Sequence, residues 1–562
     1  MESSASASGA DGAPSLAARR QRLILVAAIL GTTVVTVDST VVNVALPAIE
    51  EDLGGGLAGQ QWTANAYLVT LGSLLLIGGS LGDIFGERRV FAFGVGAFGV
   101  TSLACALAPT IEILVAARAL QGVAGALLTP AALAVIVANF APDERGKAVG
   151  AWTAWGGIGT VLGPLVGGQL VDAASWRWIF AINVPIVLGT MWLILRVVPQ
   201  ARERDPDARV DVVGALLCAF GLAGMTFGLI EQPLRGWGSP VVAGTLIGGA
   251  LLFAGFLLWE ARTRHPMLPL ALFKRHNFTF GNIETFAMYG GLGLLFFFLV
   301  LFLQQVAGWS ATAAGTASIP VTVMMFAFST RFGMLADRYG PRFFMGVGPL
   351  VAAAGLALLM RLDADVNYLT DLLPGLLVFG LGLSITVAPL TSTVLADADE
   401  SNAGIASGVN NAIARVAGLV AIAAVGAVVA ASFSSRLEDE VGDQANRPQV
   451  AAAVEAARDQ PLSAVEVQGV PEDVQASVRE SAEDASVGAF RVGVGISTAL
   501  VALGGILGLV GIRNPRRRVA AADCPGGQFA GHPREATRQS PCDWDEHARP
   551  QDQRAQPQQA PT

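Results

Sequence analysis

The chain has 562 residues, of which 53% are hydrophobic and only 14% are charged. A soluble domain normally carries about 25% charged residues, so this composition excludes an ordinary soluble protein. The formal net charge is −8, and acidic residues cluster in 434–487 and in the C-terminal tail, so the charge pattern does not indicate nucleic-acid binding.

Fourteen apolar stretches follow one another along the chain, and each is long enough to cross a bilayer, which needs about 20 mostly apolar residues. They lie near residues 23–46, 63–82, 90–108, 111–138, 148–170, 178–196, 211–231, 240–260, 278–304, 312–333, 342–362, 372–396, 404–433 and 488–512. Because lipid offers no partner for backbone polar groups, these stretches are predicted to be helices. We therefore expect an all-α integral membrane protein with 14 transmembrane helices.

Basic residues lie mostly on alternate sides of these stretches. With the N-terminus inside, the short outer loops contain only Arg177, Arg235 and Arg361. The positive-inside rule then predicts that both termini are cytoplasmic, with the acidic inner loop 397–403 as an exception. The first 18 residues lack the basic start of a signal peptide, so we expect the first helix to be retained.

Composition also indicates the nature of the two terminal segments and the kind of organism that the protein comes from. Residues 1–22 are expected to form a cytoplasmic N-terminal segment, and 513–562 a disordered cytoplasmic tail with too few apolar residues to fold alone. Of the 36 basic residues only Lys147 and Lys274 are lysines, which with abundant Ala and Gly is typical of a GC-rich bacterial genome. We expect a multi-pass protein of the bacterial inner (plasma) membrane.

A loop motif, Gly-x-Leu-x-Asp-x-x-Gly followed by basic residues, occurs after the second and after the tenth helix. Its key residues are Gly79, Asp83, Gly86, Arg88 and Arg89 in the first copy, and Asp337, Arg338, Gly340 and Arg342 in the second. The repeat predicts two six-helix halves, 23–196 and 278–512, with two inserted helices at 211–260. The acidic segment 434–487 is expected to be an external loop in which stretches such as 449–458 and 471–486 can form short helices. We expect each copy to be a conformational latch that forms in one state only; a purely topogenic loop is the alternative.

Three further motifs carry a resemblance to a known family. The first helix contains VDSTVVNVALPAI from Val37, the fourth helix contains Arg118, Gln121, Gly122, Gly125 and Ala126, and the fifth contains Gly159, Gly163, Pro164, Gly167 and Gly168. Residues 176–185 read WRWIFAINVP before the sixth helix. Together these segments resemble the major facilitator superfamily, specifically its fourteen-helix drug:proton antiporter branch, over roughly residues 23–512.

The resemblance implies a major-facilitator-type fold and proton-coupled export. In that family the fifth-helix motif is thought to control leakage and exchange. Independently of the family, Gly159, Gly163 and Gly167 are four residues apart and form one small-residue stripe, which allows close helix packing. A packing face without antiport is therefore the alternative interpretation of this motif.

Ionisable residues at bilayer depth are costly and usually mark functional sites. Asp38 lies about 22 Å up the first helix, and Arg118 lies about 10 Å from the outer face, so both fall at similar depth and can pair. A carboxyl that alternates between a paired and an unpaired state can bind and release a proton. Glu284 is predicted to be a second proton site or a contact for cationic substrates, and an interfacial glutamate is the alternative.

Other polar and aromatic residues fall within the apolar stretches. We expect Arg415 to join Asn410 and Asn411 in a structural hydrogen-bonded network rather than to contact substrate. Candidates for an adaptable apolar pocket are Trp152, Trp155, Phe286, Met288, Tyr289, Phe296, Met324 and Met325.

The sequence as a whole predicts a proton-coupled antiporter that exports amphiphilic drugs or antibiotics by alternating access. Its partners would be the substrate, protons and the bilayer, and we expect a monomer. A dedicated exporter of a self-made metabolite, siderophore or lipid is the nearest alternative, and a receptor or scaffold without transport is a third. No His/Cys cluster has metal spacing and no GxxxxGK[ST] loop occurs, so we expect no enzyme, cofactor, metal or ATP drive.

Overall fold

The structure is a computed structural model that describes residues 16–199, 210–264, 266–396, 403–442, 447–458, 461–462 and 472–514. Several predicted features lie outside these residues: the first 15 residues, most of the acidic loop 397–403, and the tail from 515 onward. The side chain of Asp83 and the surroundings of Gly79, in the first latch copy, also lie outside the described set.

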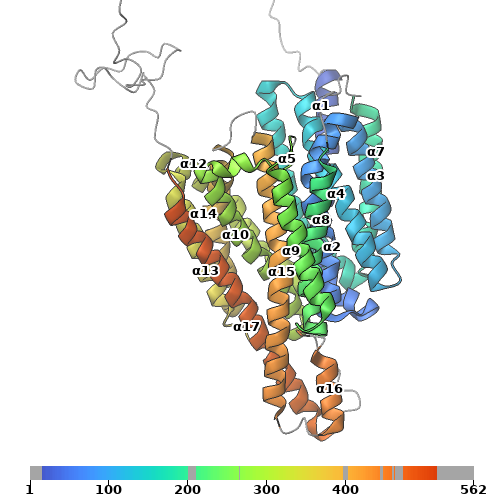
Figure 1. Cartoon of the computed structure of the whole chain (residues 1–562), viewed down its shortest axis with the longest axis vertical. Coiled ribbons are helices and arrows are strands. Elements are labelled where there is room, and N and C mark those ends of the chain that lie inside the picture. Colours follow the sequence, from blue (N-terminus) through green and yellow to red (C-terminus); the bar gives the residue numbers. More distant parts are fainter. Residues whose placement is uncertain are drawn as a thin grey trace, which may run out of the picture. The chain divides into compact units, whose positions relative to one another are not determined.

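Among the described residues every regular element is a helix, and Figure 1 shows the long helices side by side with roughly parallel axes. The first half comprises α1 Leu16–Leu53, α2 Gly56–Phe85, α3 Glu87–Ala106, α4 Ile111–Asn139, α5 Pro142–Ala173, α6 Trp178–Ala181 and α7 Asn183–Val197. The predicted span 178–196 is thus interrupted at Ile182, between α6 and α7.

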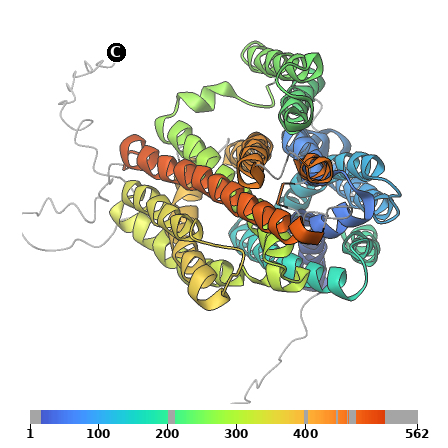
Figure 2. The ribbon, with the colours of Figure 1, turned by 90° about the horizontal axis from the view of Figure 1, so that it is seen from below.

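The inserted pair is α8 Val212–Arg235 and α9 Pro240–Glu260. The second half comprises η1 Leu270–Lys274, α10 His276–Leu301, η2 Phe302–Val306, α11 Ala311–Thr316, α12 Ile319–Tyr339, α13 Pro341–Leu359, η3 Tyr368–Leu372, α14 Leu373–Ala396, α15 Ala403–Val441, α16 Pro448–Arg458 and α17 Glu472–Gly511. Helix α8 packs against α2 of the first half and α15 of the second, and Figure 2 shows the inserted pair in green at the periphery.

Twelve helical segments of the described residues are long and apolar enough to cross a membrane. They coincide with twelve of the predicted spans. The other two predicted spans, 63–82 and 148–170, fall within α2 and α5, which are 30 and 32 residues long. The chain is therefore a multi-pass helical membrane protein, and the count of fourteen stays a prediction.

The described residues of the predicted external loop 434–487 are largely helical, and the helices lie near the stretches 449–458 and 471–486 that the sequence offers for them. Helix α15 continues to Val441, α16 spans Pro448–Arg458 and α17 begins at Glu472, and Figure 1 shows these segments extending beyond one end of the bundle. Their buried apolar residues recur at helical spacing: Leu437 and Val441, Val450 and Val454, and Val478, Ala482 and Ala485. Such amphipathic helices carry too many charges to resemble membrane spans, although they bury a continuous apolar stripe.

The two halves share their loop geometry, which supports the repeat. Gly86 has φ 90° and ψ 134°, and Gly340 has φ 92° and ψ 146°, a backbone region that glycine adopts far more easily than other residues. Two residues later, Arg88 Nη2 donates to the carbonyl of Leu195 at 2.8 Å, and Arg342 Nε donates to the carbonyl of Leu509 at 2.6 Å.

These arginines therefore tie the third helix of each half to the last helix of that half. In the second copy the side chains of Asp337 and Arg338 are exposed. The latch function of both copies stays a prediction.

Candidate functional site

The predicted pairing of Asp38 with Arg118 is present in the core of the first half. Arg118 Nη1 on α4 donates to Asp38 Oδ2 on α1 at 2.5 Å. The side chains are 1% and 0% exposed, respectively. Because desolvating two charges is expensive, a pair buried this deeply needs further hydrogen bonds around it.

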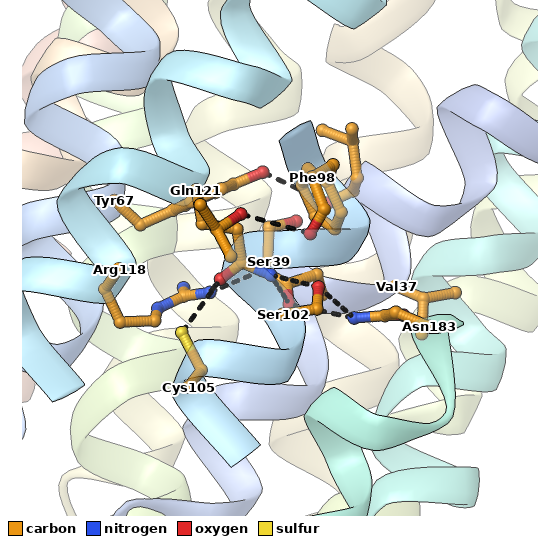
Figure 3. Close-up of polar contacts among 12 residues, drawn as sticks. Val37, Ser39, Tyr67, Phe98, Ser102, Cys105, Arg118, Gln121 and Asn183 are labelled. Carbon is orange, nitrogen blue, oxygen red and sulfur yellow. Dashed lines mark hydrogen bonds and ion pairs between the residues drawn. The ribbon is translucent and has the colours of Figure 1, made fainter. Parts of the chain in front are cut away.

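Three neutral residues supply those hydrogen bonds, and Figure 3 shows their side chains pointing toward one another. Gln121 Nε2 donates to Asp38 Oδ1 at 2.9 Å and to Ser102 Oγ at 2.8 Å, while its Oε1 accepts from Arg118 at 2.7 Å. Asn183 Nδ2 lies 3.3 Å from Asp38 Oδ1 and 3.4 Å from Ser102 Oγ. The carboxylate is thus held by α1, α3, α4 and α7 together.

Arg118 has a second set of partners on its other side. Its Nε donates to the backbone carbonyl of Thr63 at 3.1 Å, and its guanidinium lies 4.4 Å from the ring centroid of Tyr67 and 5.6 Å from that of Phe180. Stacking on aromatic faces stabilises a desolvated arginine. Gln121 and Asn183 stand within the motifs quoted above, but the roles of Ser102 and Tyr67 had no signal beyond a polar group in an apolar stretch.

A cavity of about 400 Å³ lies between the two halves. The polar residues of its lining are Thr36, Ser39, Thr40, Asn43, Tyr67, Arg118, Tyr289, Ser318, Thr322, Asn411 and Arg415. Arg118 reaches this lining from the buried network, whereas Asp38 does not. We call this space the central chamber.

A second space of about 430 Å³ lies between α10, α12 and α14, and we call it the apolar chamber. It shares Tyr289, Leu292, Phe296 and Thr322 with the lining of the central chamber, so the two chambers adjoin. The remainder of its lining is mainly apolar, with Met288, Met325 and Phe326 among the larger side chains. Methionine and aromatic side chains allow such a pocket to adapt to different ligands.

Four of the eight predicted pocket residues line these chambers. They are Met288, Tyr289, Phe296 and Met325. Trp152 instead donates to Thr32 Oγ1 at 2.9 Å, and Trp155 and Phe286 are 52% and 41% exposed. Met324 packs against Gly380 of α14, where an added Cβ would stand 3.2 Å from Met324 Cβ, so these four lie elsewhere. Helix periodicity alone did not reveal which face of each helix turns inward.

Glu284 is fully buried on α10 and lies in the lining of neither chamber. Among the described residues, neither of its carboxyl oxygens has a hydrogen-bond partner. The side chain faces α17, since a Cβ on Gly508 would stand 2.9 Å from Glu284 Oε2. The absence of a side chain at Gly508 thus makes room for this carboxyl away from both chambers.

Among the described residues, Arg415 makes no hydrogen bond to Asn410 or Asn411. Asn410 Nδ2 donates instead to Asn282 Oδ1 at 3.1 Å and to Thr285 Oγ1 at 2.8 Å, and Asn411 Nδ2 donates to the carbonyl of Ser407 at 3.0 Å. Arg415 lies in the lining of the central chamber. The predicted network with Arg415 is therefore not formed among the described residues, because the asparagine side chains find partners on α10 and on their own helix.

The small-residue stripe on α5 packs against α1, as its spacing predicts. A Cβ on Gly159 would stand 3.4 Å from the Thr33 side chain, one on Gly163 would collide with Thr40, and one on Gly167 would collide with Val41. A larger residue at either of the last two positions would force the Thr40 or Val41 side chain to move, so glycine favours the observed approach of the helices.

The end of the same motif contacts the other half of the protein. A Cβ on Gly168 would lie 2.5 Å from Thr312 Cα and 2.7 Å from the carbonyl oxygen of Ala311. Beyond it, the Asp172 carboxylate accepts from the backbone amides of Ala311 at 3.0 Å and Thr312 at 2.8 Å. The contact joins α5 to the start of α11.

Two side-chain hydrogen bonds join the halves at the same end of the bundle. Gln304 Nε2 donates to the carbonyl of Val44 at 3.0 Å, and Gln61 Nε2 donates to the carbonyl of Ile422 at 2.9 Å. Together with the α5–α11 contact, they join the two halves at the end of the bundle that the charge pattern predicts to be outside.

Known proteins are similar to this chain in sequence and in fold. Residues 28–422 match the Major Facilitator Superfamily. The chain is 35% identical over 456 residues to the tetracenomycin C resistance and export protein of Streptomyces glaucescens, covering 80% of this chain and 82% of that protein. It is 36% identical over 423 residues to a puromycin resistance protein of Streptomyces alboniger, covering 74% and 83%. It is 34% identical over 467 residues to a probable actinorhodin transporter of Streptomyces coelicolor, covering 81% and 79%.

Solved structures agree on the fold. A bacterial homolog of the human lysosomal transporter Spinster, in an inward-facing and unoccupied conformation, is 17% identical and superposes with a TM-score of 0.59, covering 90% of this chain and all of that one. The POT family transporter PepTSo is 12% identical with a TM-score of 0.58, covering 88% and 97%. The chain therefore belongs to the Major Facilitator Superfamily and is a multi-pass membrane transporter, not an enzyme.

Proposed function

We propose that this transporter is a proton-coupled antiporter that exports amphiphilic drugs or antibiotics across the bacterial inner membrane, with both termini in the cytoplasm. The observation that carries the proposal is the buried Asp38–Arg118 pair beside a central chamber lined by both halves. The named functions of the relatives, antibiotic resistance and export, support drug or secondary-metabolite export.

The coupling acts through helix packing, because Asp38 does not reach the chamber. Protonation of Asp38 removes the charge that holds Arg118, and Arg118 lines the chamber and rests on Tyr67. Loosening α1 against α4 then favours separation of the α5–α11 contact and opening to the outside. Deprotonation to the cytoplasm restores the pair and resets the exchange.

The two loop motifs and the fifth-helix motif have complementary roles in this cycle. We place the latches of Gly86 and Gly340 at the inner end, where they stabilise the state that is closed to the cytoplasm. The motif from Gly159 to Gly168 seals the outer end in the state described here. Alternating access follows because the two seals do not form together.

The test of proton coupling uses everted vesicles from cells that lack their own exporters, with a pH-sensitive dye and a panel of fluorescent amphiphiles and antibiotics. Export by the wild-type protein is expected to stop when a protonophore is added. Asp38→Asn is expected to slow proton-coupled export by about 5- to 150-fold, the range of typical coupling free energies.

The matched control is Asp52→Asn, on the same helix but in an exposed pair with Arg177. It should export at the wild-type rate. Full proton-coupled export by Asp38→Asn would show that the carboxyl is not the coupling group.

Glu284 is proposed as a second proton carrier, because its carboxyl is buried and has no partner. Glu284→Gln keeps the shape that fits α17 but cannot ionise. The number of protons exchanged per substrate is obtained in proteoliposomes from the pH gradient at which net substrate transport stops. In Glu284→Gln this number should be lower by about one. Glu231→Gln, at the end of α8 and paired with Arg235, is the control. An unchanged ratio in Glu284→Gln would leave Glu284 a packing residue only.

A dedicated exporter of a self-made secondary metabolite is the second candidate function. It is favoured by relatives that are named for one compound, such as the tetracenomycin C and actinorhodin proteins. Resistance to many unrelated compounds would favour the multidrug function, and export of a single compound would favour the dedicated one. A siderophore or lipid would be a variant of the dedicated case, while a receptor or scaffold would export nothing.

A further inference from the structure

The side chains that line the two chambers carry positive charge without matching negative charge in the linings. Of the residues that the structure describes, neither lining contains an aspartate or a glutamate, and the charged ones are Arg118 and Arg415. The charge of Arg118 is neutralised by Asp38. Arg415 has no hydrogen-bond or ion-pair partner among the described residues. The substrate space therefore carries one positive charge that the protein itself does not neutralise.

Arg415 is positioned to meet a ligand. It lies on α15 opposite Gly72 of α2, where a Cβ would stand 3.7 Å from Arg415 Cβ, and the adjacent turn presents Asn411 to the same chamber. Tyr67 and Tyr289 line the same chamber. An arginine within the membrane is costly unless it pairs or faces water, which makes an unpaired one a binding-site hypothesis by default.

The adjoining apolar chamber suits the remainder of such a ligand. Tyr289 and Phe296 form the shared wall, and Met288, Met325 and Phe326 line the space behind it. Arginine binds carboxylates and related anions through parallel hydrogen bonds, while aromatic and methionine side chains pack on flat apolar rings. An anionic group on one side and an aromatic body on the other would occupy both chambers.

We propose that the preferred substrates are aromatic amphiphiles with an anionic head group, which binds Arg415, and an apolar ring system, which enters the chamber between α10, α12 and α14. Lipophilic cations are poor ligands of this site. The inference rests on the proposed export function, whose substrate class it specifies, and it removes the cationic-substrate role considered for Glu284.

The proposed class also constrains the coupling. Protonation of Asp38 leaves the charge of Arg118 without its partner, and direct electrostatics would then hold an anion more tightly. Release must therefore come from the conformational change, in which α15 and α10 move away from α2 and α1. Proton and substrate are coupled through the state of the transporter rather than through contact.

The test is equilibrium binding to the purified full-length protein in lipid nanodiscs, with two probes that differ in charge alone. Pyrenebutyrate and pyrenebutylammonium share one ring system and one chain length. The anion is expected to bind wild type about tenfold or more tightly than the cation, as a charge-assisted hydrogen bond predicts. Arg415→Gln should abolish that preference, and Arg415→Lys should retain part of it.

Arg436→Gln is the matched control, because Arg436 lies on the same helix about 31 Å further along and outside both chambers. It should bind both probes as wild type does. Two results would overturn the proposal. One is wild-type protein that binds the cation as tightly as the anion or more tightly, and the other is Arg415→Gln that binds the anion as tightly as wild type does. Anion-selective binding without proton-dependent export would contradict the proposed function and support this inference. Proton-driven export of cations alone would support the proposed function and contradict this inference.

Discussion

Asp38→Ala is expected to lower the free energy of unfolding by about 3–5 kcal/mol, because it leaves the Arg118 guanidinium buried without its counter-charge. The side chain of Arg118 is 1% exposed, so water cannot replace the lost carboxylate without opening the helix packing. The free energy of unfolding is measured by titrating the purified protein in mixed micelles with a denaturing detergent under reversible conditions.

Two further variants identify the cause of that loss. The double variant Asp38→Ala/Arg118→Leu removes the unpaired charge as well and should recover most of the lost stability, so the two effects are strongly non-additive. Asp52→Ala breaks an exposed pair whose side chains are 47% and 36% exposed, and should cost no more than about 1 kcal/mol. If Asp38→Ala were no more destabilising than Asp52→Ala, the buried pair would not hold the first half together.

Gly168→Val is expected to abolish export by preventing closure of the outer end. The added side chain would collide with Thr312 Cα and with the carbonyl of Ala311, which are backbone atoms of α11 and cannot rotate away. The α5–α11 contact and the two hydrogen bonds from Asp172 would be lost together. The transporter would remain open to the outside, so export should fall to the background of cells without the protein.

The conformation can be measured separately from export. Ser318 lines the central chamber at the start of α12, and Ser318→Cys provides a thiol there. Labelling of the protein without this substitution, which has four native cysteines, is the blank. A membrane-impermeant thiol reagent added outside should react faster in the Gly168→Val background. Gly150→Val, on the same helix with nothing within 4 Å of the added carbon, should change neither reactivity nor export. Slow labelling in Gly168→Val would contradict a role for Gly168 in the outer seal.

Much of the architecture followed from residue pattern alone. Hydropathy predicted the positions of the helices, and the repeated glycine loop predicted two related halves, which the matching backbone angles at Gly86 and Gly340 support. Depth along each helix predicted that Asp38 could meet Arg118. These inferences succeed because the rise per residue is constant and the bilayer sets a common scale.

The acidic segment 434–487 shows what hydropathy leaves open. Its charges recur every few residues and indicate a loop with at most short helices, and in the structure the apolar residues between them, such as Val450 and Val454, form a buried helical stripe. Length and mean hydropathy identify membrane spans, but not amphipathic helices that pack on one another outside the apolar core.

By itself the sequence determined the helical membrane class, the superfamily motifs, the repeat and the Asp38–Arg118 pair. Only the tertiary structure decided which way each helix faces: Glu284 toward α17 and away from both chambers, Arg415 into the central chamber with no hydrogen-bond partner among the described residues, and Phe286 to the exposed surface of the bundle. A sequence states the spacing of residues on a helix. The rotation of that helix is decided by side chains of neighbours far away in the chain, such as the glycines of α5 on α1, because close packing admits few orientations.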